Sequence, residues 1–341
     1  MIGRIYFNKY DILYFTTMKH KNYYEIIARD NYDLGLQTGK LFGKITRSSL
    51  EKRKKENDCR LKAENAKKYL DVTIKFFPQY IEEIKGYATS SHISFEDLWT
   101  LMTDVEFHEK CTTFVINNGQ TISHNEDWEK DSKNDICILR KTIKDTTLLE
   151  LYYYNTLGGV SISINSFGLV QAINTLEHID SQIGVPRNII ARWLSETKDP
   201  EMDYEKLKLI PRANGYNHVF VNKDSVYNLE CTAHQQILSK PSPPFIHTNH
   251  YISEILKPLE KTENLTYTFQ RYKKTRDLIK DKMSMEEIVK VNSDITEGPR
   301  ASIMNERTIA KMVLDLKNKI AKIWLKREDK KNWIDYSLDF L

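Results

Sequence analysis

The first hundred residues carry hydrophobic side chains at the three- and four-residue spacing that is typical of amphipathic helices. Residues 22–43 combine apolar positions with three glycines spaced four apart, which would line one helix face for close packing. A charged helix is predicted up to Lys67, and an apolar stripe after it is interrupted by Pro78, which suits the start of the next helix. Ser94 and Asp97 form a capping-box pattern before a last helix that leads toward Cys111.

From Cys111 onward the pattern changes to short apolar runs separated by turn residues. Successive short strands favour an antiparallel sheet, and helices between two groups of strands indicate an α+β layered fold. The predicted strands are 136–139, 147–154, 160–164, 169–173, 218–221, 226–230, 308–316, 320–325 and 333–338, and the predicted helices are 188–194, 204–209, 267–280 and 285–291.

Composition narrows the class of protein. The 341 residues are 40% hydrophobic, enough for one large core or two modest ones. The 51 basic and 47 acidic residues leave a charge of +4 that is spread along the chain, so nucleic-acid binding is not favoured. No window approaches the roughly 18 apolar residues of a membrane span, and the N-terminus lacks a secretory signal. The four scattered cysteines include no CxxC pair, so a cytoplasmic protein with free thiols is predicted.

A cysteine opens the first predicted hairpin. Residues 111–116 and 121–128 are β-branched and aromatic runs on either side of an Asn-Gly turn. In the second strand Asn125 and Asp127 are two apart and therefore share a face, which could bring polar groups back beside the Cys111 thiol. On these residues alone, a structural hairpin with a partly buried cysteine is the favoured interpretation.

Several motifs along the chain carry a resemblance to a known family. They are Cys111-Thr112-Thr113, Asn125-Glu126-Asp127, Gly184-Val185-Pro186-Arg187 and His247-Thr248-Asn249-His250, with Gly159, Asn165, Gly168, Asn174, Thr308 and Asp315. In this order the chain resembles the acyl-coenzyme A:6-aminopenicillanate acyltransferase family of N-terminal-nucleophile (Ntn) hydrolases from Tyr24 to Leu338. The resemblance implies an αββα sandwich with a helical N-terminal segment. It also implies self-cleavage between Lys110 and Cys111, into a segment 1–110 and a catalytic core 111–341 that form one integrated domain.

Self-cleavage would make Cys111 the first residue of a mature fragment. A thiol with a pKa of about 8.5 is mostly protonated at neutral pH, and a freed α-amino group with a pKa of about 7.7 to 8 can accept its proton. A side-chain amide that stabilises the negative charge on the attacked carbonyl oxygen is worth about 3 kcal/mol. By match to the family motifs, Cys111 is the predicted nucleophile, Asn249 the amide donor and Asp127 the group that orients or charges the amine.

Further residues are predicted to support this site. They are Asn125, Thr112, Arg307, His247 and Glu230. Arg307 stands in for a late family arginine that has no matching position, and Glu230 could equally satisfy groups at a strand end. The family usually has glycine before the nucleophile, where this chain has Lys110, and this departure bears on the N-to-S acyl shift of self-cleavage.

A metal site is the alternative interpretation of the histidines. His247 and His250 could bind a metal with His218, His234 or Cys231. Because side chains three apart in an extended segment point to opposite faces, hydrogen bonding around a pocket is favoured, and no metal is expected. No cofactor is expected either. Acyl-coenzyme A could serve as a substrate, but no Gly-rich phosphate loop supports it.

The prediction is therefore a cysteine-dependent Ntn amidohydrolase or acyltransferase. It would act on a small-molecule linear amide or acyl thioester through a thioester acyl-enzyme. Two alternatives stay open: a strict hydrolase of small amides without acyl transfer, and a non-catalytic family member that serves as a binding or scaffold protein.

Overall fold

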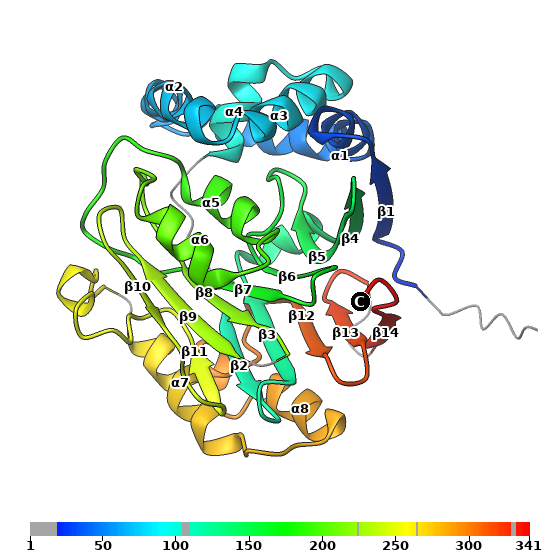
Figure 1. The fold of residues 1–341 in the computed structure, drawn as a ribbon, viewed down its shortest axis with the longest axis vertical. Helices are drawn as coiled ribbons and strands as arrows, with labels where there is room; N and C mark the ends of the chain where they lie inside the picture. Colours follow the sequence, from blue (N-terminus) through cyan, green and yellow to red (C-terminus); the bar gives the residue numbers. More distant parts are fainter. Residues whose placement is uncertain (1–18, 104–109, 224, 264, 329–331) are drawn as a thin grey trace, which may run out of the picture.

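The computed structural model describes residues 19–103, 110–223, 225–263, 265–328 and 332–341. Its elements form four layers in the order helix, sheet, sheet, helix (Figure 1). An eight-stranded sheet and a six-stranded sheet make the two middle layers. This arrangement confirms the predicted α+β class and the αββα sandwich.

The larger sheet has the strand order β1-β4-β5-β6-β7-β8-β9-β10. Strands β1 and β4 run parallel and the other neighbours are antiparallel. From β4 to β10 the spatial order follows the sequence order, and the antiparallel pairing agrees with the prediction from the successive short apolar runs. The strands are β1 Tyr23–Ala28, β4 Ile136–Ile143, β5 Thr146–Tyr153, β6 Ile162–Asn165, β7 Val170–Asn174, β8 Asn217–Val221, β9 Val226–Cys231 and β10 Gln236–Ser239.

The smaller sheet has the order β11-β2-β3-β12-β13-β14, and all its neighbours are antiparallel. The hairpin β2-β3 therefore lies inside the sheet, between β11 and β12. Its position explains why the residues of both strands are buried. The strands are β2 Thr112–Ile116, β3 Thr121–Asp127, β11 Phe245–His247, β12 Thr308–Asp315, β13 Ile320–Leu325 and β14 Ile334–Ser337.

Helices cover the outer face of each sheet (Figure 1). The helices against the larger sheet are α1 Asn31–Arg53, α2 Cys59–Phe76, α3 Pro78–Ser91, α4 Phe95–Met102, α5 Arg187–Leu194 and α6 Pro200–Leu207. Helices α7 Leu265–Leu278 and α8 Met285–Asn292 cover the smaller sheet, and the short α9 Gly298–Ala301 follows them. Ser94 caps α4 by accepting from the Asp97 N–H, as predicted. Among the described residues, no helix combines the length and apolarity that a membrane crossing requires.

Three apolar layers hold the sheets and helices together. Strand residues alternate between faces, so Val115 of β2 packs between the two sheets while Phe114 packs toward α7 and α8. The inter-sheet layer includes Ile138 from the larger sheet and Met312 from the smaller one. The hairpin that carries Cys111 is therefore fixed by apolar contacts on both faces.

The structure differs from the sequence-based prediction at residues 23–28, which form strand β1 instead of the start of a helix. The run Tyr-Tyr-Glu-Ile-Ile is rich in aromatic and β-branched residues, which favour strands. Asp30 then caps α1 by accepting from the Asp33 N–H, so the helix begins only at Asn31. Strand β10 is a second element that the apolar pattern did not predict, because three of its four residues are half-buried.

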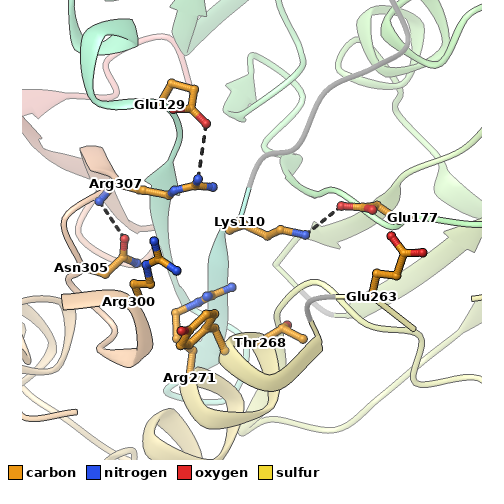
Figure 2. A pocket seen from close by; sticks show the side chains of 10 residues that line it. Lys110, Glu129, Glu177, Glu263, Thr268, Arg271, Arg300, Asn305 and Arg307 are labelled. Carbon is orange, nitrogen blue, oxygen red and sulfur yellow. Dashed lines mark hydrogen bonds and ion pairs between the residues drawn. The ribbon is translucent and has the colours of Figure 1, made fainter. Parts of the chain in front are cut away.

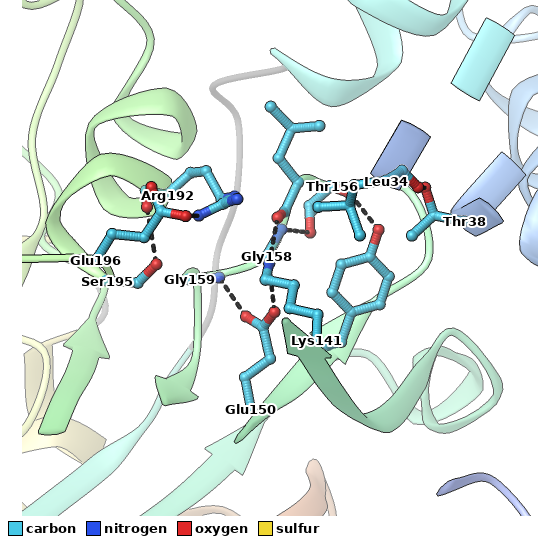
Figure 3. A network of polar contacts seen from close by, with 12 residues as sticks. Leu34, Thr38, Lys141, Glu150, Thr156, Gly158, Gly159, Arg192, Ser195 and Glu196 are labelled. Carbon is cyan, nitrogen blue, oxygen red and sulfur yellow. Dashed lines mark hydrogen bonds and ion pairs between the residues drawn. The ribbon is translucent and has the colours of Figure 1, made fainter. Parts of the chain in front are cut away.

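A buried polar network joins the N-terminal helices to the larger sheet (Figure 3). Lys141 and Glu150 form an ion pair of 2.6 Å with both side chains fully buried, and the Gly159 N–H also donates to Glu150. Arg192 of α5 pairs with Glu83 of α3 at 3.3 Å and with Glu196 at 2.7 Å. Because a buried charge left without its partner is strongly destabilising, the Glu83–Arg192 pair ties residues before Cys111 to residues after it.

Candidate active site

The hairpin β2-β3 positions the predicted nucleophile. Its turn uses Asn117, Asn118 and Gly119, all of which have positive φ angles of 55° to 81°, so the predicted Asn-Gly turn is confirmed. The register pairs Thr112 with Asn125. Two residues before Thr112, the Lys110 N–H donates to the backbone oxygen of Asp127 at 3.0 Å.

This register divides the site between two faces of one strand. Cys111 lies opposite Glu126, and paired residues of a hairpin point to the same face. The Cys111 thiol therefore points toward the space between the sheets, where its sulfur and one ligand atom each of His124 and Glu126 lie within 4.8 Å of one another. Asn125 and Asp127 do share a face, as predicted, but it is the opposite face from the Cys111 side chain.

His124 joins Thr113 to Glu126 by hydrogen bonds on this face of the hairpin. Thr113 donates its only hydroxyl hydrogen to Asn174 Oδ1 at 3.0 Å, so Thr113 Oγ1 accepts from His124 Nδ1 at 2.9 Å. His124 Nε2 and Glu126 Oε2 are 3.0 Å apart, and one shared proton satisfies this contact. The Glu126 carboxyl also accepts from the Tyr153 hydroxyl at 2.9 Å and from Ser161.

Asp127 is fully buried on the other face of β3. Its carboxyl accepts from Thr308 Oγ1 at 2.6 Å and from the Asn305 side-chain amide. Burial raises the pKa of Asp127 to about 6, against the opposing effects of the Arg271 guanidinium and of these hydrogen bonds. A carboxyl of this kind is protonated in mild acid and ionised at neutral pH.

Arg271 of α7 connects the predicted residues to one another. Its side chain is buried, and it donates to Thr112 Oγ1 at 3.1 Å and to Asn249 Oδ1 at 2.7 Å. It also interacts electrostatically with Asp127 and with Cys111, while burial lowers its pKa below the usual value. An arginine nevertheless stays charged, so a fixed cation lies among these groups.

Asn249 follows the short strand β11 and is held on both sides of its amide. Its Oδ1 accepts from Arg271, and its Nδ2 donates to the backbone oxygen of Thr175 at 3.1 Å. Its backbone N–H donates to Thr268 Oγ1 at 2.7 Å. The arginine therefore fixes which end of the amide carries the N–H groups.

The predicted supporting residues separate into different surroundings. Asn125 donates to the backbone oxygens of Asn292 and Ile303, away from the thiol. Thr112 contacts Arg271. Arg307 forms an ion pair with Glu129 at 3.4 Å, with 41% of its side chain exposed.

His247 and Glu230 form a buried pair with a separation of 3.1 Å. Although burial acts to raise it, the pKa of Glu230 lies below the usual value because His247 and the backbone N–H groups of Ile252 and Ser253 donate to the carboxylate. The rings of His247 and His250 stack with centroids 6.3 Å apart, which contradicts the expectation that they point to opposite faces. The reason is that β11 ends at His247, so the alternation of a strand does not continue to His250.

A cavity of about 350 Å³ lies beside the Lys110–Cys111 peptide (Figure 2). Its lining residues are Lys110, Glu129, Glu177, Glu263, Tyr267, Thr268, Arg271, Arg300, Asn305 and Arg307. Lys110 and Arg271 face it, whereas the Cys111 side chain is fully buried. In the uncut chain, a substrate in this cavity would therefore be kept from the thiol.

Cys111, His124 and Glu126 offer one sulfur, one nitrogen and one oxygen atom to a metal ion among the described residues. Zn²⁺ accepts all three kinds of ligand. The hydrogen bonds of Glu126 to His124, Tyr153 and Ser161 already account for the polar contacts of this cluster without an ion. The metal ligands considered from the sequence, around His247 and His250, are a different group of residues.

Comparison with known proteins places the chain in a family. The sequence model of the acyl-coenzyme A:6-aminopenicillanic acid acyl-transferase family matches residues 116–330. The chain belongs to this family. The acyltransferase match begins five residues after Cys111, so it includes Asp127 and Asn249 but not the predicted nucleophile.

One curated relative is named as a hydrolase. A β-alanyl-dopamine/carcinine hydrolase of Drosophila melanogaster is 24% identical over 212 residues, which are 52% of this chain and 55% of the relative. The chain thus spans about half the length of the curated relative it matches.

Two solved structures are also similar. A conjugated bile acid hydrolase from Clostridium perfringens has a TM-score of 0.45 and 11% identity over 68% of this chain and 92% of that one. Penicillin V acylase from Agrobacterium tumefaciens has a TM-score of 0.43 and 12% identity over 66% of this chain and 86% of that one.

Sequence reasoning missed Arg271, His124 and Glu126. Arg271 shares one buried helix face with Thr268 and Thr275, and this polar spacing of three and four residues was the available signal. The position of Glu126 opposite Cys111 could have been counted outward from the turn, because pairing Ile116 with Thr121 fixes the rest of the hairpin.

Proposed function

We propose that this chain is a cysteine-dependent amidohydrolase or acyltransferase that cuts its own Lys110–Cys111 bond. The observation that carries the proposal is the buried Arg271, which donates to Asn249 and interacts electrostatically with Asp127 and Cys111. One fixed cation therefore adjoins all three residues that the sequence predicts as catalytic. Membership of the acyltransferase family supports the same reaction class.

The first proposed step is self-cleavage, for which the α-amine is not yet available. The nitrogen of Cys111 is then a peptide nitrogen, so another group must take the thiol proton. Glu126 lies on the thiol's face of the hairpin, and an ionised carboxylate offers about four lone-pair positions. Three donors occupy it, from His124, Tyr153 and Ser161, which leaves capacity for the thiol.

The bond changes of self-cleavage follow from this arrangement. The Cys111 sulfur attacks the carbonyl carbon of Lys110, and the S–C bond forms as the C–N bond breaks. The thiol proton passes through the Glu126 carboxyl to the released nitrogen of Cys111. Water then hydrolyses the thioester, which yields a carboxylate on Lys110 and a free thiol on an N-terminal cysteine.

In turnover, the freed amine of Cys111 replaces Glu126 as the proton acceptor. Asp127, ionised at neutral pH, would hold and orient this amine, while Asn249 would donate to the negatively charged oxygen of the attacked carbonyl. Expulsion of the substrate's amine leaves a thioester acyl-enzyme. Water resolves it in a hydrolase and an acceptor amine resolves it in a transferase.

The size of the cavity favours a small amide as substrate. Its 350 Å³ lies near the lower end of the roughly 300–1,000 Å³ of ligand pockets. An acyl-coenzyme A would have to leave most of its length outside this volume. The Drosophila relative is named as a hydrolase of β-alanyl-dopamine and carcinine, which agrees with hydrolysis of a small amide.

Intact-mass analysis of the purified protein tests the proposal. We expect two fragments that meet at Lys110–Cys111, and a Cys111→Ala chain that stays whole and does not turn over an amide. Cys137→Ala is the matched control, because Cys137 is also fully buried and burial holds the pKa of its thiol well above the usual value. A wild-type chain that stays whole and binds small amides without hydrolysing them would instead support the non-catalytic alternative.

A further inference from the structure

The residue on the acyl side of the proposed cut already occupies a charged site. Lys110 Nζ lies 2.8 Å from Glu177 Oε1, and the two side chains are only 18% and 24% exposed. Both residues line the cavity beside the Lys110–Cys111 peptide. The ammonium of Lys110 therefore extends along the cavity wall to a carboxylate (Figure 2).

In self-cleavage, Lys110 is the acyl group that is transferred to the Cys111 sulfur. An acyl group from a substrate must reach the same sulfur through a carbonyl in an equivalent position. The groups that hold the Lys110 side chain in the uncut chain are therefore in place to hold the acyl chain of a substrate. After the cut, Lys110 must withdraw before a substrate can bind, and its ammonium then no longer contacts Glu177.

The cavity has ends of opposite charge. Glu177 and Glu263 lie at the end that the Lys110 side chain reaches, whereas Arg300 and Arg307 lie at the other end (Figure 2). Arg307 is paired with Glu129 at that second end. A substrate whose acyl chain carries a positive charge would complement the acidic end.

The geometry points to Glu177 as the specificity residue for a cationic acyl group, so that the substrates are amides of ω-amino acids. The inference rests on the proposed function and adds to it the class of acyl group. Lysine itself sets the reach: a 6-aminohexanoyl group has the same number of carbons between carbonyl and amine as Lys110 has. Shorter aminoacyl groups would reach Glu177 less fully.

The test compares three para-nitroanilides of equal acyl length on the self-cleaved wild-type enzyme. They carry 6-aminohexanoyl (cationic), hexanoyl (neutral) and 5-carboxypentanoyl (anionic) groups. A partly buried ion pair is worth more than an exposed one, so we expect kcat/KM for the cationic amide to exceed that for the neutral one by about tenfold or more. Glu177→Gln should abolish this preference through KM and leave the hexanoyl amide unaffected.

Two further variants separate recognition from folding. Glu177→Asp shortens the side chain by one carbon, so it should keep the cationic preference but move the optimum to the longer 7-aminoheptanoyl amide. Glu254→Gln is the matched control, because Glu254 is 83% exposed, pairs with Lys257 and lies outside the cavity lining. This control should retain the wild-type preference.

The outcomes distinguish the inference from the proposed function. A wild type that cuts itself and hydrolyses the hexanoyl or carboxypentanoyl amide at least as well as the cationic one overturns the cationic site alone. A Glu177→Gln enzyme that keeps the full preference for the cationic amide also overturns the cationic site alone. A wild type that neither cuts itself nor hydrolyses any of the three amides overturns the proposed function, and the cationic site with it.

Discussion

Replacing Asp127 by asparagine should change how stability depends on pH. The Asp127 carboxyl is fully buried, and its pKa of about 6 lies above the value of 3.8 that it has in an unfolded chain. The folded protein therefore holds this proton more tightly than the unfolded chain does. The stability that the proton contributes is fully present below pH 3.8 and is lost as the pH rises through about 6.

The size of the effect follows from the two pKa values. A rise from 3.8 to about 6, at 1.36 kcal/mol per unit of pKa, corresponds to about 3 kcal/mol. About 2 kcal/mol of this loss falls between pH 4.5 and 7.5, because the unfolded chain has already released part of its proton at the lower pH. Asparagine has no such proton, so the variant should gain about 2 kcal/mol on the wild type over this interval.

Urea unfolding at several pH values measures the difference. Both proteins should carry Cys111→Ala, which keeps the chain whole whether or not the wild type cuts itself. Asparagine cannot accept from both Thr308 and Asn305 as a carboxylate does, and this costs about 1–3 kcal/mol at every pH. Only the change of the stability difference with pH therefore tests the raised pKa of Asp127. A wild-type advantage that stays constant with pH, or that grows as the pH rises, would refute a raised pKa for Asp127.

Two other substitutions test the groups that sequence reasoning missed. Arg271→Met removes the cation that orients Asn249, so kcat should fall by about 10²–10³-fold. Because Arg271 holds the pKa of Asp127 down, the acid limb of the pH–rate profile should also move to higher pH, and an unmoved limb would contradict that coupling. Glu126→Gln should slow self-cleavage by about 10²-fold or more in an intact-mass time course, while turnover per cleaved molecule stays at the wild-type value. Equal loss of both rates would show that Glu126 does not act in the first step alone.

Much of the fold follows from periodicity, because alternation and helical spacing are local properties of the sequence. The turn at Asn118-Gly119 and the cap at Ser94 are local in the same way. Strand β1 was not predicted because its pairing with β4 joins residues more than a hundred positions apart, and its apolar run merges with the helix that follows. Contacts of this kind depend on which elements become neighbours in space.

In the candidate site too, some residues could be predicted from local sequence and others depend on contacts between distant parts of the chain. The motif positions of Asp127 and Asn249 could be read from the chain, but the arginine that lies between them comes from a helix that appears mostly polar. The packing of α7 against β2, β11 and α9 makes Arg271 a buried cation. Likewise, the hydrogen bonds that oppose the effect of burial on the pKa of Asp127 come from Asn305 and Thr308, which lie some 180 residues further along the chain.

Glu126 and Asp127 are adjacent carboxyl groups that the strand separates. Glu126 points between the sheets toward the Cys111 thiol, whereas Asp127 points toward Arg271. This separation suits two stages of one reaction: the thiol needs a proton acceptor before the cut, and the new amine needs a carboxylate after it. A shift of the hairpin by one residue would exchange the two faces. The turn at Asn117 to Gly119, which sets the register, is therefore as important to the proposed chemistry as either carboxyl group.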